Sequence, residues 1–321
     1  MANRSMVYVG IDEAGYGPNL GPLVVASTAF LAPAEWLRAD WWKTLAPMVG
    51  RTSSKAPLII DDSKRILANT RGEETLGETL HTILSLTGQV QHSLEELIDA
   101  IAPQDKEHYR QEHWYQAGVP CRWPDHLSPA TQESIRDFFN HHGVSLLPIR
   151  ARVMFPAMFN QRLIPCATKA DVEAELIADL LRTQWANFPP GIDQIDITID
   201  RLGGRRYYRE FLEECFTQAM VLTRQESPEI SEYSILDQGC EYTIRFLVKG
   251  DQHSLAVASA SMMAKYLRNE SMESFNRYWQ RAVPGLVATA GYPNDARRFL
   301  EEIRPLLSVH QVSLDQIWRQ R

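Results

Sequence analysis

The sequence has few cysteines, and none of them belongs to a C-x-x-C pair. The four cysteines stand far apart in a chain of 321 residues: Cys121, Cys166, Cys215 and Cys240. A zinc ribbon needs cysteines paired at short spacing, so this class of metal site is excluded. Sparse single thiols are typical of reduced cysteines in a cytosolic protein, and this is the state that we expect.

Long apolar runs are also absent. No stretch approaches the roughly 20 consecutive apolar residues that a helix needs to span a bilayer. The N-terminal segment MANRSMVYVGIDEAG has no apolar leader followed by a small-residue cleavage site. We therefore expect a soluble, cytoplasmic protein that has no membrane partner.

The chain lacks an excess of positive charge. Its net charge is −7, with hydrophobic residues at 44% and charged residues at 23%. Such a composition is ordinary for a folded protein, and it gives no bulk attraction to nucleic acid. Any nucleic-acid site must then be a local basic patch. Internal repeats and low-complexity tracts are absent too, and we predict a single domain over residues 1–321.

Apolar periodicity predicts an α/β core with helices on both faces of a mixed sheet. The polar and aromatic segment 89–142 is predicted to be an insertion of short helices, or a lid. Predicted strands cover residues 6–11, 23–31, 144–155, 195–200, 220–224 and 242–248. Predicted helices cover residues 64–86, 168–181, 207–219 and 254–279, and smaller helices follow to the end.

The stretch VGIDEAGYGPNLGPLVV (9–25) joins the first two strands through a glycine-rich turn. Its spacing is G-x-G-x-x-x-G, and the run that follows is strand-like. A dinucleotide loop must open a helix, and a phosphate loop carries a lysine that is missing here. Both are excluded. A tight hairpin turn with helpful glycines remains open as the plain alternative.

Four carboxylates stand at or next to the ends of three apolar runs: Asp12, Glu13, Asp200 and Asp251. The carboxyl ends of strands form the edge where open α/β sheets bind ligands. Hard oxygen donors without a nearby histidine or cysteine cluster favour Mg²⁺ or Mn²⁺. Taken singly, Asp251 could cap the following helix and Asp200 could be a turn residue.

The adjacent pair Asp12 and Glu13 raises a geometric question. Side chains alternate along a strand, so a regular strand sends the two acids to opposite faces. We expect both to reach one metal pair only if the chain bends there. Gly10 and Gly15 would permit such a bend.

Five segments, in this order, resemble the type 2 ribonucleases H, the ribonuclease HII and HIII family. They are GIDEAGYGPNLGPLVV (10–25), DDSK (61–64), IDRL (199–202), KGDQHSLAVASASMMAKYLRNESM (249–272) and AGYP (290–293). The resemblance implies a ribonuclease H-like mixed sheet flanked by helices. It also implies a metal-dependent endoribonuclease that cleaves RNA in RNA–DNA hybrids and leaves 5′-phosphate and 3′-hydroxyl ends.

The resemblance assigns roles residue by residue. Two Mg²⁺ or Mn²⁺ ions would be the cofactors, and an RNA–DNA hybrid or ribonucleotide-containing DNA would be the partner. The four acids Asp12, Glu13, Asp200 and Asp251 would be both catalytic residues and metal ligands. Substrate would be contacted by Gly15, Tyr16, Gly17, Ser63, Lys64, Lys265 and Tyr292.

The sequence departs from the family in ways that mark a divergent branch. Tyr16 stands where the HII branch has an arginine that contacts phosphate. Arg201 and Leu202, and the segment AMFNQ (157–161), are more like the HIII branch. The gap from Asp12 to Asp200 is 200 − 12 = 188 positions, which is long for the family.

Basic and aromatic residues supply candidate nucleic-acid contacts. Lys249 stands two positions before the last acid, and Lys265 and Arg268 follow it in the same segment, so all three are expected near the proposed metals. A second group follows Asp200 and combines cations with aromatic rings: Arg201, Arg205, Arg206, Tyr207, Tyr208 and Arg209. The alternative is a solvated helix face, with i,i+4 ion pairs Arg206–Glu210 and Arg209–Glu213. Trp114, Tyr115 and Trp123 would form either a substrate platform or a small satellite core.

Two rival functions remain beside the ribonuclease. One is a related nuclease that acts on another structured nucleic acid. The other is a nucleic-acid-binding protein with weak or no catalysis. Retention of all four acids favours the enzymes.

Overall fold

The computed structural model describes residues 5–115, 119–124, 127–163, 168–185, 188–189, 191–192, 194–237 and 240–320. Its centre is a seven-stranded mixed sheet in the order β5-β2-β1-β6-β9-β8-β7. β1 is antiparallel to β2 and parallel to β6, and β6 is parallel to β9. The strands are β1 Ser5–Ala14, β2 Leu23–Pro33, β5 Ser145–Met154, β6 Gln194–Asp200, β7 Met220–Glu226, β8 Ile230–Asp237 and β9 Cys240–Leu247. Two short strands, β3 Val49–Gly50 and β4 Leu58–Ile59, pair separately.

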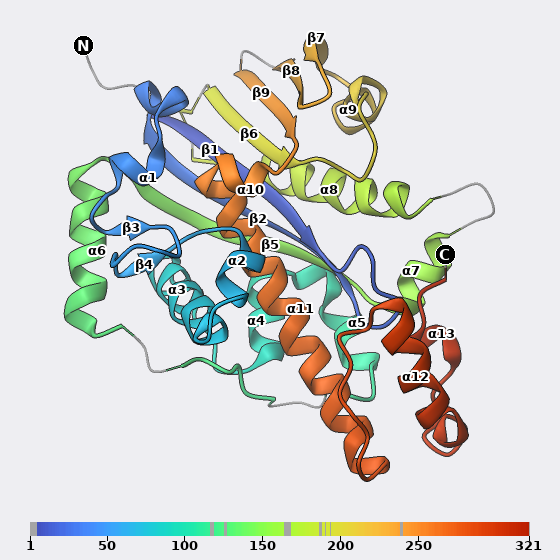
Figure 1. Ribbon diagram of the computed structural model, residues 1–321. Coiled ribbons are helices and arrows are strands. Elements are labelled where there is room, and N and C mark those ends of the chain that lie inside the picture. The colour runs from blue at the N-terminus through green and yellow to red at the C-terminus, as the bar shows by residue number, and fades with distance from the viewer. Residues whose placement is uncertain are drawn as a thin grey trace.

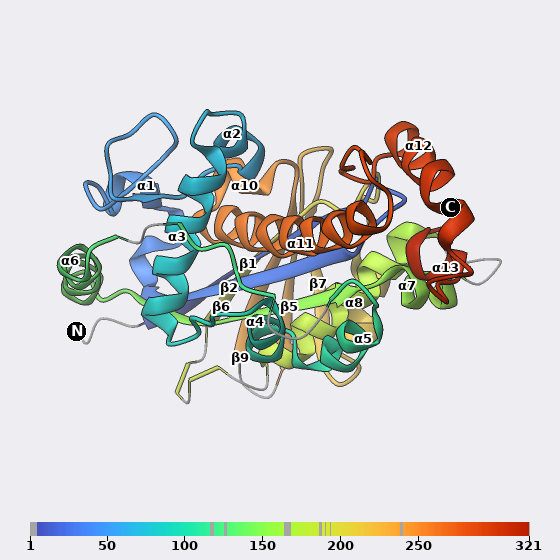
Figure 2. The same cartoon turned by 90° about the horizontal axis from the view of Figure 1, so that it is seen from below.

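Helices cover both faces of this sheet, as Figures 1 and 2 show. The long α11 crosses β1 and β2 on one face, and α8 packs against β2 and β5 on the other. The α-helices are α1 Trp41–Thr44, α2 Ser63–Leu67, α3 Gly72–Thr87, α4 Leu94–Ile101, α5 Lys106–Gln111, α6 Pro129–His141, α7 Pro156–Arg162, α8 Lys169–Trp185, α9 Arg209–Cys215, α10 Gly250–His253, α11 Leu255–Ala282, α12 Pro293–Ile303 and α13 Leu314–Ile317. Three 3₁₀ turns complete them: η1 Ala34–Arg38, η2 Pro103–Asp105 and η3 Arg304–Leu306.

The central strands are buried on both faces because helices lie above and below them. In β6 the isoleucines face one side and Asp196 and Thr198 the other, yet both sets are buried. Strict alternation in the sequence therefore marks the two faces, although neither face is open to water. The mixed α/β architecture predicted from the sequence is confirmed.

Helix α11 lies unusually close to β1, and small residues make this approach feasible. A Cβ built on Gly10 would stand 2.0 Å from the carbonyl carbon of Ala256. The Thr28 hydroxyl on β2 donates a hydrogen bond to the carbonyl of Ala256 at 2.7 Å. The alanines and serines of α11 are buried in this contact, so the small-residue stretch has the helix-packing role typical of such a stretch.

The predicted insertion 89–142 contains α4, η2, α5 and α6, and it is tied into the core. Buried Asp105 accepts two hydrogen bonds from the Arg152 guanidinium of β5, each at 3.0 Å. Trp114 packs edge-on against Phe275 of α11, and Trp123 stacks on Tyr266 with ring centroids 4.7 Å apart. Trp114 and Tyr115 are buried, so they serve as core residues and do not form an exposed platform.

Two predicted helices and one strand differ from the structure. The predicted helix 64–86 is two helices, α2 and α3. Between them the backbone turns so tightly that a Cβ on Gly72 would stand 2.4 Å from the Ile66 carbonyl oxygen. The predicted helix 207–219 shortens to α9, since Tyr208 belongs to the core before the helix begins. Strand β8 was not predicted, and it pairs with β7 and β9 at the edge of the sheet.

Candidate metal centre

Three of the four predicted acids meet where β1 and β6 part. The last parallel pair between these strands is Ile11 with Ile199, whereas β1 stays paired with β2 as far as Ala14. Asp12 and Glu13 lie just beyond that last pair, and Asp200 ends β6. No bend is needed, which corrects the expectation above. Beyond the last β1–β6 pair, a Glu13 oxygen lies within 4.8 Å of an Asp200 oxygen.

The carboxylates of Asp12, Glu13 and Asp200 form a compact group. Each offers one oxygen, and these oxygens all lie within 4.8 Å of one another. Asp12 is buried, and Glu13 and Asp200 are half-buried. Three ionised oxygens this close repel one another unless protons or cations neutralise them. Hard oxygen donors at this spacing fit a divalent cation such as Mg²⁺ or Mn²⁺.

Hydrogen bonds hold the acids in place. The backbone N–H of Gly250 donates to the Asp200 carboxylate at 2.7 Å, which ties β6 to the start of α10. The backbone N–H of Glu13 donates to Asp12 Oδ1, also at 2.7 Å. The Ser261 hydroxyl of α11 donates a further bond to Asp12. The group is therefore positioned from the strand ends and from α11.

Burial and mutual repulsion both raise the pKa values of the clustered carboxyl groups. Burial, and then the charges of Glu13 and Asp200, hold the pKa of Asp12 well above its usual range. Burial raises the pKa of Asp200 to about 6, although its backbone hydrogen bond to Gly250 opposes the shift. Shifted carboxyl pKa values in a cleft are typical of functional sites, and here their main cause is burial, to which the like charges of neighbouring acids add.

Asp251 lies beside this group but outside the set of oxygens that fall within 4.8 Å. Burial, with the charges of Asp62 and Asp200, raises its pKa to about 6. It occupies the first turn of α10, and the cap of α11 is Ser254, whose side chain accepts from the Val257 N–H. The helix-cap alternative for Asp251 is therefore wrong.

All predicted site residues line one cavity of 210 Å³. This cavity is bounded by β1, the glycine-rich loop, α2, the end of β6, α10, α11 and the loop before α12. Its lining is Asp12, Glu13, Ala14, Gly15, Tyr16, Gly17, Pro18, Asp62, Ser63, Lys64, Asp200, Asp251, Ser261, Lys265, Arg268 and Tyr292. The roles assigned by the resemblance stay predictions, but the residues stand together.

The DDSK segment places a serine and a lysine at the cavity. Asp61 is buried and anchors the segment by accepting from Arg51 at 3.0 Å and from the Thr52 N–H at 3.1 Å. Asp62 caps α2 by accepting from the Lys64 N–H at 2.8 Å. The Ser63 hydroxyl lies 3.2 Å from that of Ser261. Lys64 is exposed, and its charge lowers the pKa of both Asp200 and Asp251 against the larger effect of burial.

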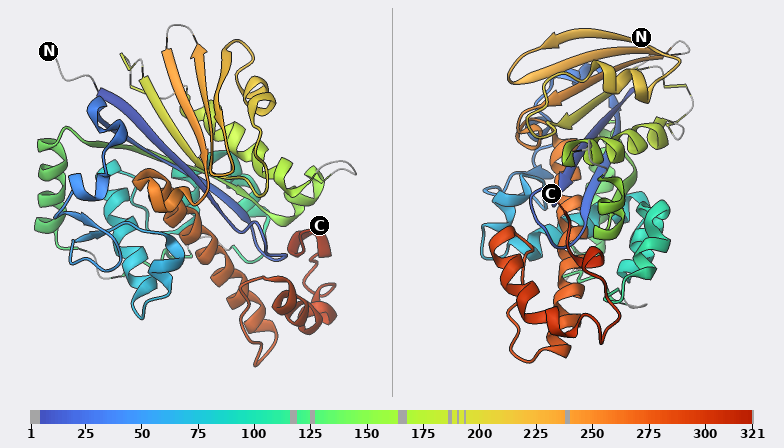
Figure 3. Two further views of the ribbon diagram at one scale, coloured as in Figure 1. Left: turned by 45° about the horizontal axis from the view of Figure 1, so that its top comes forward. Right: turned by 90° about the vertical axis from the view of Figure 1, so that its right-hand side faces the viewer.

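Two arginines, Arg268 and Arg319, pack against the glycine-rich loop. Gly15 has a φ of +98°, and a Cβ there would stand 2.7 Å from Arg268 Nε, so only glycine fits. Arg319, near the end of the chain, donates to the carbonyls of Gly15 and Pro18. Figure 3 shows the C-terminus beside this loop. Arg319 is fully buried, and desolvation lowers its guanidinium pKa to about 9.

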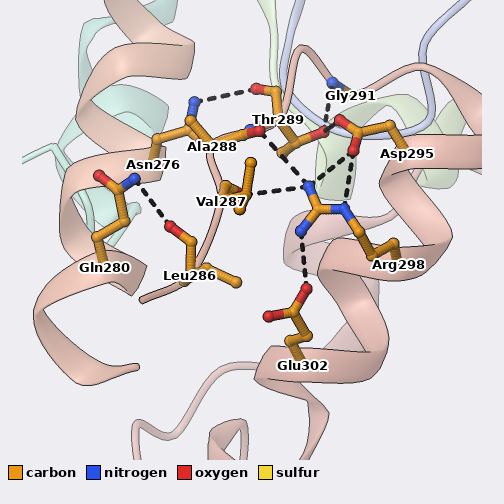
Figure 4. Close-up of polar contacts among 10 residues, drawn as sticks. All are labelled: Asn276, Gln280, Leu286, Val287, Ala288, Thr289, Gly291, Asp295, Arg298 and Glu302. Atoms are coloured by element: carbon orange, nitrogen blue, oxygen red, sulfur yellow. Dashed lines mark hydrogen bonds and ion pairs between the residues drawn. The ribbon is translucent and has the colours of Figure 1, made fainter. Parts of the chain in front are cut away.

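A network of hydrogen bonds holds the loop that carries Tyr292 (Figure 4). The Asn276 amide of α11 donates to the Thr289 carbonyl and accepts from the Thr289 N–H, each at 2.9 Å. Asp295 accepts from the Thr289 hydroxyl and from Arg298 Nε. The Gly291 carbonyl in turn accepts from the Asn19 N–H at 2.8 Å. The two loops that frame the cavity are thereby locked together, while the Tyr292 side chain remains 53% exposed.

The Tyr16 side chain lies toward the segment after Asp200. Its hydroxyl stands 3.6 Å from the point where a Cβ on Gly203 would be. Its pKa is raised by burial and then by the charges of Glu173 and Glu13. Tyr16 therefore borders the acids on the side of α8.

The arginines after Asp200 do not share one helix face, because α9 begins only at Arg209. Arg206 donates to the carbonyl of Glu226 at 2.9 Å. Arg209 pairs with Glu213 at 2.8 Å on an exposed surface. The solvated ion pair predicted as an alternative is present for Arg209. Arg206 lies before the start of α9 and donates to the Glu226 carbonyl.

Sequence reasoning missed three residues that lie at this site. Ser261 stands in the recognised segment 249–272, four positions before Lys265, so the two residues lie on neighbouring turns of α11. Glu173 lies within the correctly predicted helix 168–181, at a position with no local signal. Arg319 is 304 positions from the carbonyl of Gly15 to which it donates, so nothing local points to it.

Among the residues that the structure describes, no helix is both long enough and apolar enough to cross a membrane.

Comparison with known proteins gives one local match in sequence. No family model matches the chain. A stretch of 54 residues is 44% identical to ribonuclease HII of Roseiflexus castenholzii, and it spans 17% of this chain and 23% of that protein. Over this stretch the chain is similar to a ribonuclease HII. The mixed sheet flanked by helices is an α/β fold.

Solved structures of the type 2 ribonucleases H superpose over nearly the whole chain, at low identity. The ribonuclease HII in complex with PCNA from Archaeoglobus fulgidus is 16% identical, with a TM-score of 0.39 over 98% of this chain and 94% of that one. Ribonuclease H2 of Pyrococcus horikoshii is 13% identical, with a TM-score of 0.42 over 97% and 92%. The Bst-RNase HIII structure with Mn²⁺ is 16% identical, with a TM-score of 0.42 over 99% of this chain and 67% of that one.

Proposed function

We propose that this protein is a metal-dependent endoribonuclease that cleaves the RNA strand of RNA–DNA hybrids. The observation that carries the proposal is the single cavity that joins three clustered carboxylates, a glycine-rich loop and two lysines. The local match to a ribonuclease HII supports the same reaction class. The products would have 5′-phosphate and 3′-hydroxyl ends.

The acids are proposed to hold two divalent cations, Mg²⁺ or Mn²⁺. Asp12, Glu13 and Asp200 would be the shared ligands, and Asp251, at the rim of the group, would complete the set. When bound, such cations supply positive charge that favours attack of water on a phosphodiester. The protein's own contribution is to hold these carboxylates by the bonds from Gly250 and Ser261.

The substrate is proposed to lie across the mouth of the cavity. The backbone of Gly15 to Gly17 would approach the ribose 2′-hydroxyl, the group that distinguishes RNA from DNA. Lys64 and Lys265 would meet phosphates, and Ser63 would assist if its hydroxyl turns from Ser261. Exposed Tyr292 would stack on a sugar next to the cleaved bond.

One assay compares the candidate activities. An RNA–DNA hybrid, a DNA duplex with one ribonucleotide, double-stranded RNA and DNA are each incubated with the protein and Mg²⁺ or Mn²⁺. We expect cleavage of the hybrid and a loss of at least about 100-fold in Asp12→Asn, since a metal ligand is removed. Binding of hybrid without cleavage of any substrate would refute the enzyme. Cleavage of another structured substrate alone would favour the related nuclease.

A further inference from the structure

A fifth carboxylate, that of Glu173, approaches the metal centre from the side opposite α11. Glu173 lies in α8, whose start is fixed by the reciprocal hydrogen bonds of Thr168 and Asp171. Its side chain is only 1% exposed. A carboxylate so deeply buried is costly unless a partner neutralises it.

The surroundings of Glu173 offer no such partner in the described part of the chain. Its carboxyl lies within hydrogen-bonding reach of Glu13, and the charge of Asp200 acts on it as well. Its Oε2 has no hydrogen-bond partner among the described residues. No ion pair with an arginine or lysine is found for it there.

Two ionised carboxylates accept hydrogen bonds but donate none. Glu13 and Glu173 can therefore lie side by side only with a proton or a cation between them. Glu13 belongs to the three-carboxylate group, so Glu173 lies next to that group, although outside the set of oxygens that fall within 4.8 Å of one another. Its unpartnered oxygen is the kind of hard donor that Mg²⁺ and Mn²⁺ bind.

We propose that Glu173 is a further ligand of the metal centre and shares a divalent cation with Glu13. This rests on the metal centre of the proposed function. Asp12 belongs to the β1 face covered by α11, while Glu173 comes from the helix on the other face. The site is thereby closed from both sides of the sheet, and α8 becomes part of the catalytic apparatus.

Titration with Mn²⁺ alone, followed by electron paramagnetic resonance of the free ion, tests the proposal. Glu173→Gln retains size and can donate a hydrogen bond to Glu13, so it preserves a positioning role but removes a charged ligand. We expect Mn²⁺ binding to weaken by about tenfold or more in this variant. The matched control is Glu175→Gln, an exposed position on the same helix that pairs with Arg162 at 3.2 Å, and its affinity stays within twofold of native.

Glu173→Gln that binds Mn²⁺ as tightly as the native protein would overturn the proposal and show a merely structural glutamate. Anomalous diffraction from native crystals soaked in Mn²⁺ gives an answer that needs no variant. We expect a Glu173 oxygen in the ion's coordination shell, and an ion that contacts only the other acids would refute it. A native protein that binds Mn²⁺ through Glu173 but cleaves no nucleic acid would refute the proposed function and leave this inference standing.

Discussion

Gly10→Ala tests the close packing of α11 on β1, which brings Ser261, Lys265 and Arg268 to the acids. The added Cβ would stand 2.0 Å from the carbonyl carbon of Ala256 and 2.1 Å from the Val257 nitrogen. Ordinary contact begins at 3.4 Å, so the two backbones must separate by roughly 3.4 − 2.0 = 1.4 Å. Both clashing atoms belong to backbone, so no side-chain rotation relieves the strain.

This separation has an energetic and a functional consequence. Overpacking of this kind costs about 1–3 kcal/mol, and loss of the Thr28 hydrogen bond to Ala256 adds about 1 kcal/mol. We therefore expect the free energy of unfolding to fall by about 2–4 kcal/mol. Displacement of Ser261 from Asp12 by about 1 Å would lower hybrid cleavage by about 100-fold.

Urea unfolding followed by far-ultraviolet circular dichroism measures the first effect, and cleavage of a labelled hybrid measures the second. The matched control is Gly204→Ala, where a Cβ meets nothing within 4 Å and the backbone is not in the left-handed region. Its stability is expected within about 0.5 kcal/mol of native. A Gly10→Ala protein as stable as this control would refute the close approach of α11 to β1.

Three further predictions follow from buried groups. The pKa of Asp200 and of Asp251 rises from 3.8 to about 6 on folding, so the unfolded state ionises first as pH rises. The metal-free protein should therefore lose stability as the pH rises from about 4 to about 6, measured by urea unfolding in EDTA. If replacing both Asp200 and Asp251 by asparagine left this dependence of stability on pH unchanged, the prediction would be contradicted. Arg319→Met should lower the free energy of unfolding by about 1–3 kcal/mol, because the Gly15 and Pro18 carbonyls lose their hydrogen-bond donor. It should also raise KM for the hybrid more than it lowers kcat. The control is Arg304→Met at an exposed position, and equal melting temperatures of the two variants would count against the role of Arg319. Asn276→Ala should cost about 1–3 kcal/mol and lower hybrid affinity by freeing the Tyr292 loop, and hybrid binding equal to native in a fluorescence anisotropy titration would disprove that coupling.

Much of the site could be predicted from the sequence because its signals are local. Asp12 and Glu13 end an apolar run, Asp200 ends an alternating one, and the glycines mark a turn between two strands. Each signal depends on neighbours a few positions away, where strand period and turn chemistry act directly. These residues were then expected at one sheet edge, and the structure places them around one cavity.

Other features were misjudged because local pattern does not fix them. The bend proposed for Asp12 and Glu13 followed from strand period alone, which ignores where the neighbouring strand stops pairing. Gly10 was taken as a source of flexibility, whereas its function is to admit α11. Strand β8 escaped notice because polar residues interrupt its apolar pattern, and its place in the sheet depends on pairing with β7 on one side and β9 on the other.

The sequence alone determined the α/β class, the positions of the four carboxylates at strand ends and the glycine turn, since each depends on residues that are close along the chain. Only the tertiary structure decided that Glu173 of α8 lies beside Glu13 and that Arg319 holds the Gly15 loop. Those contacts join residues 160 and 304 positions apart, because 173 − 13 = 160 and 319 − 15 = 304. Their formation depends on which helix covers which face, and that is settled by the packing of the whole core.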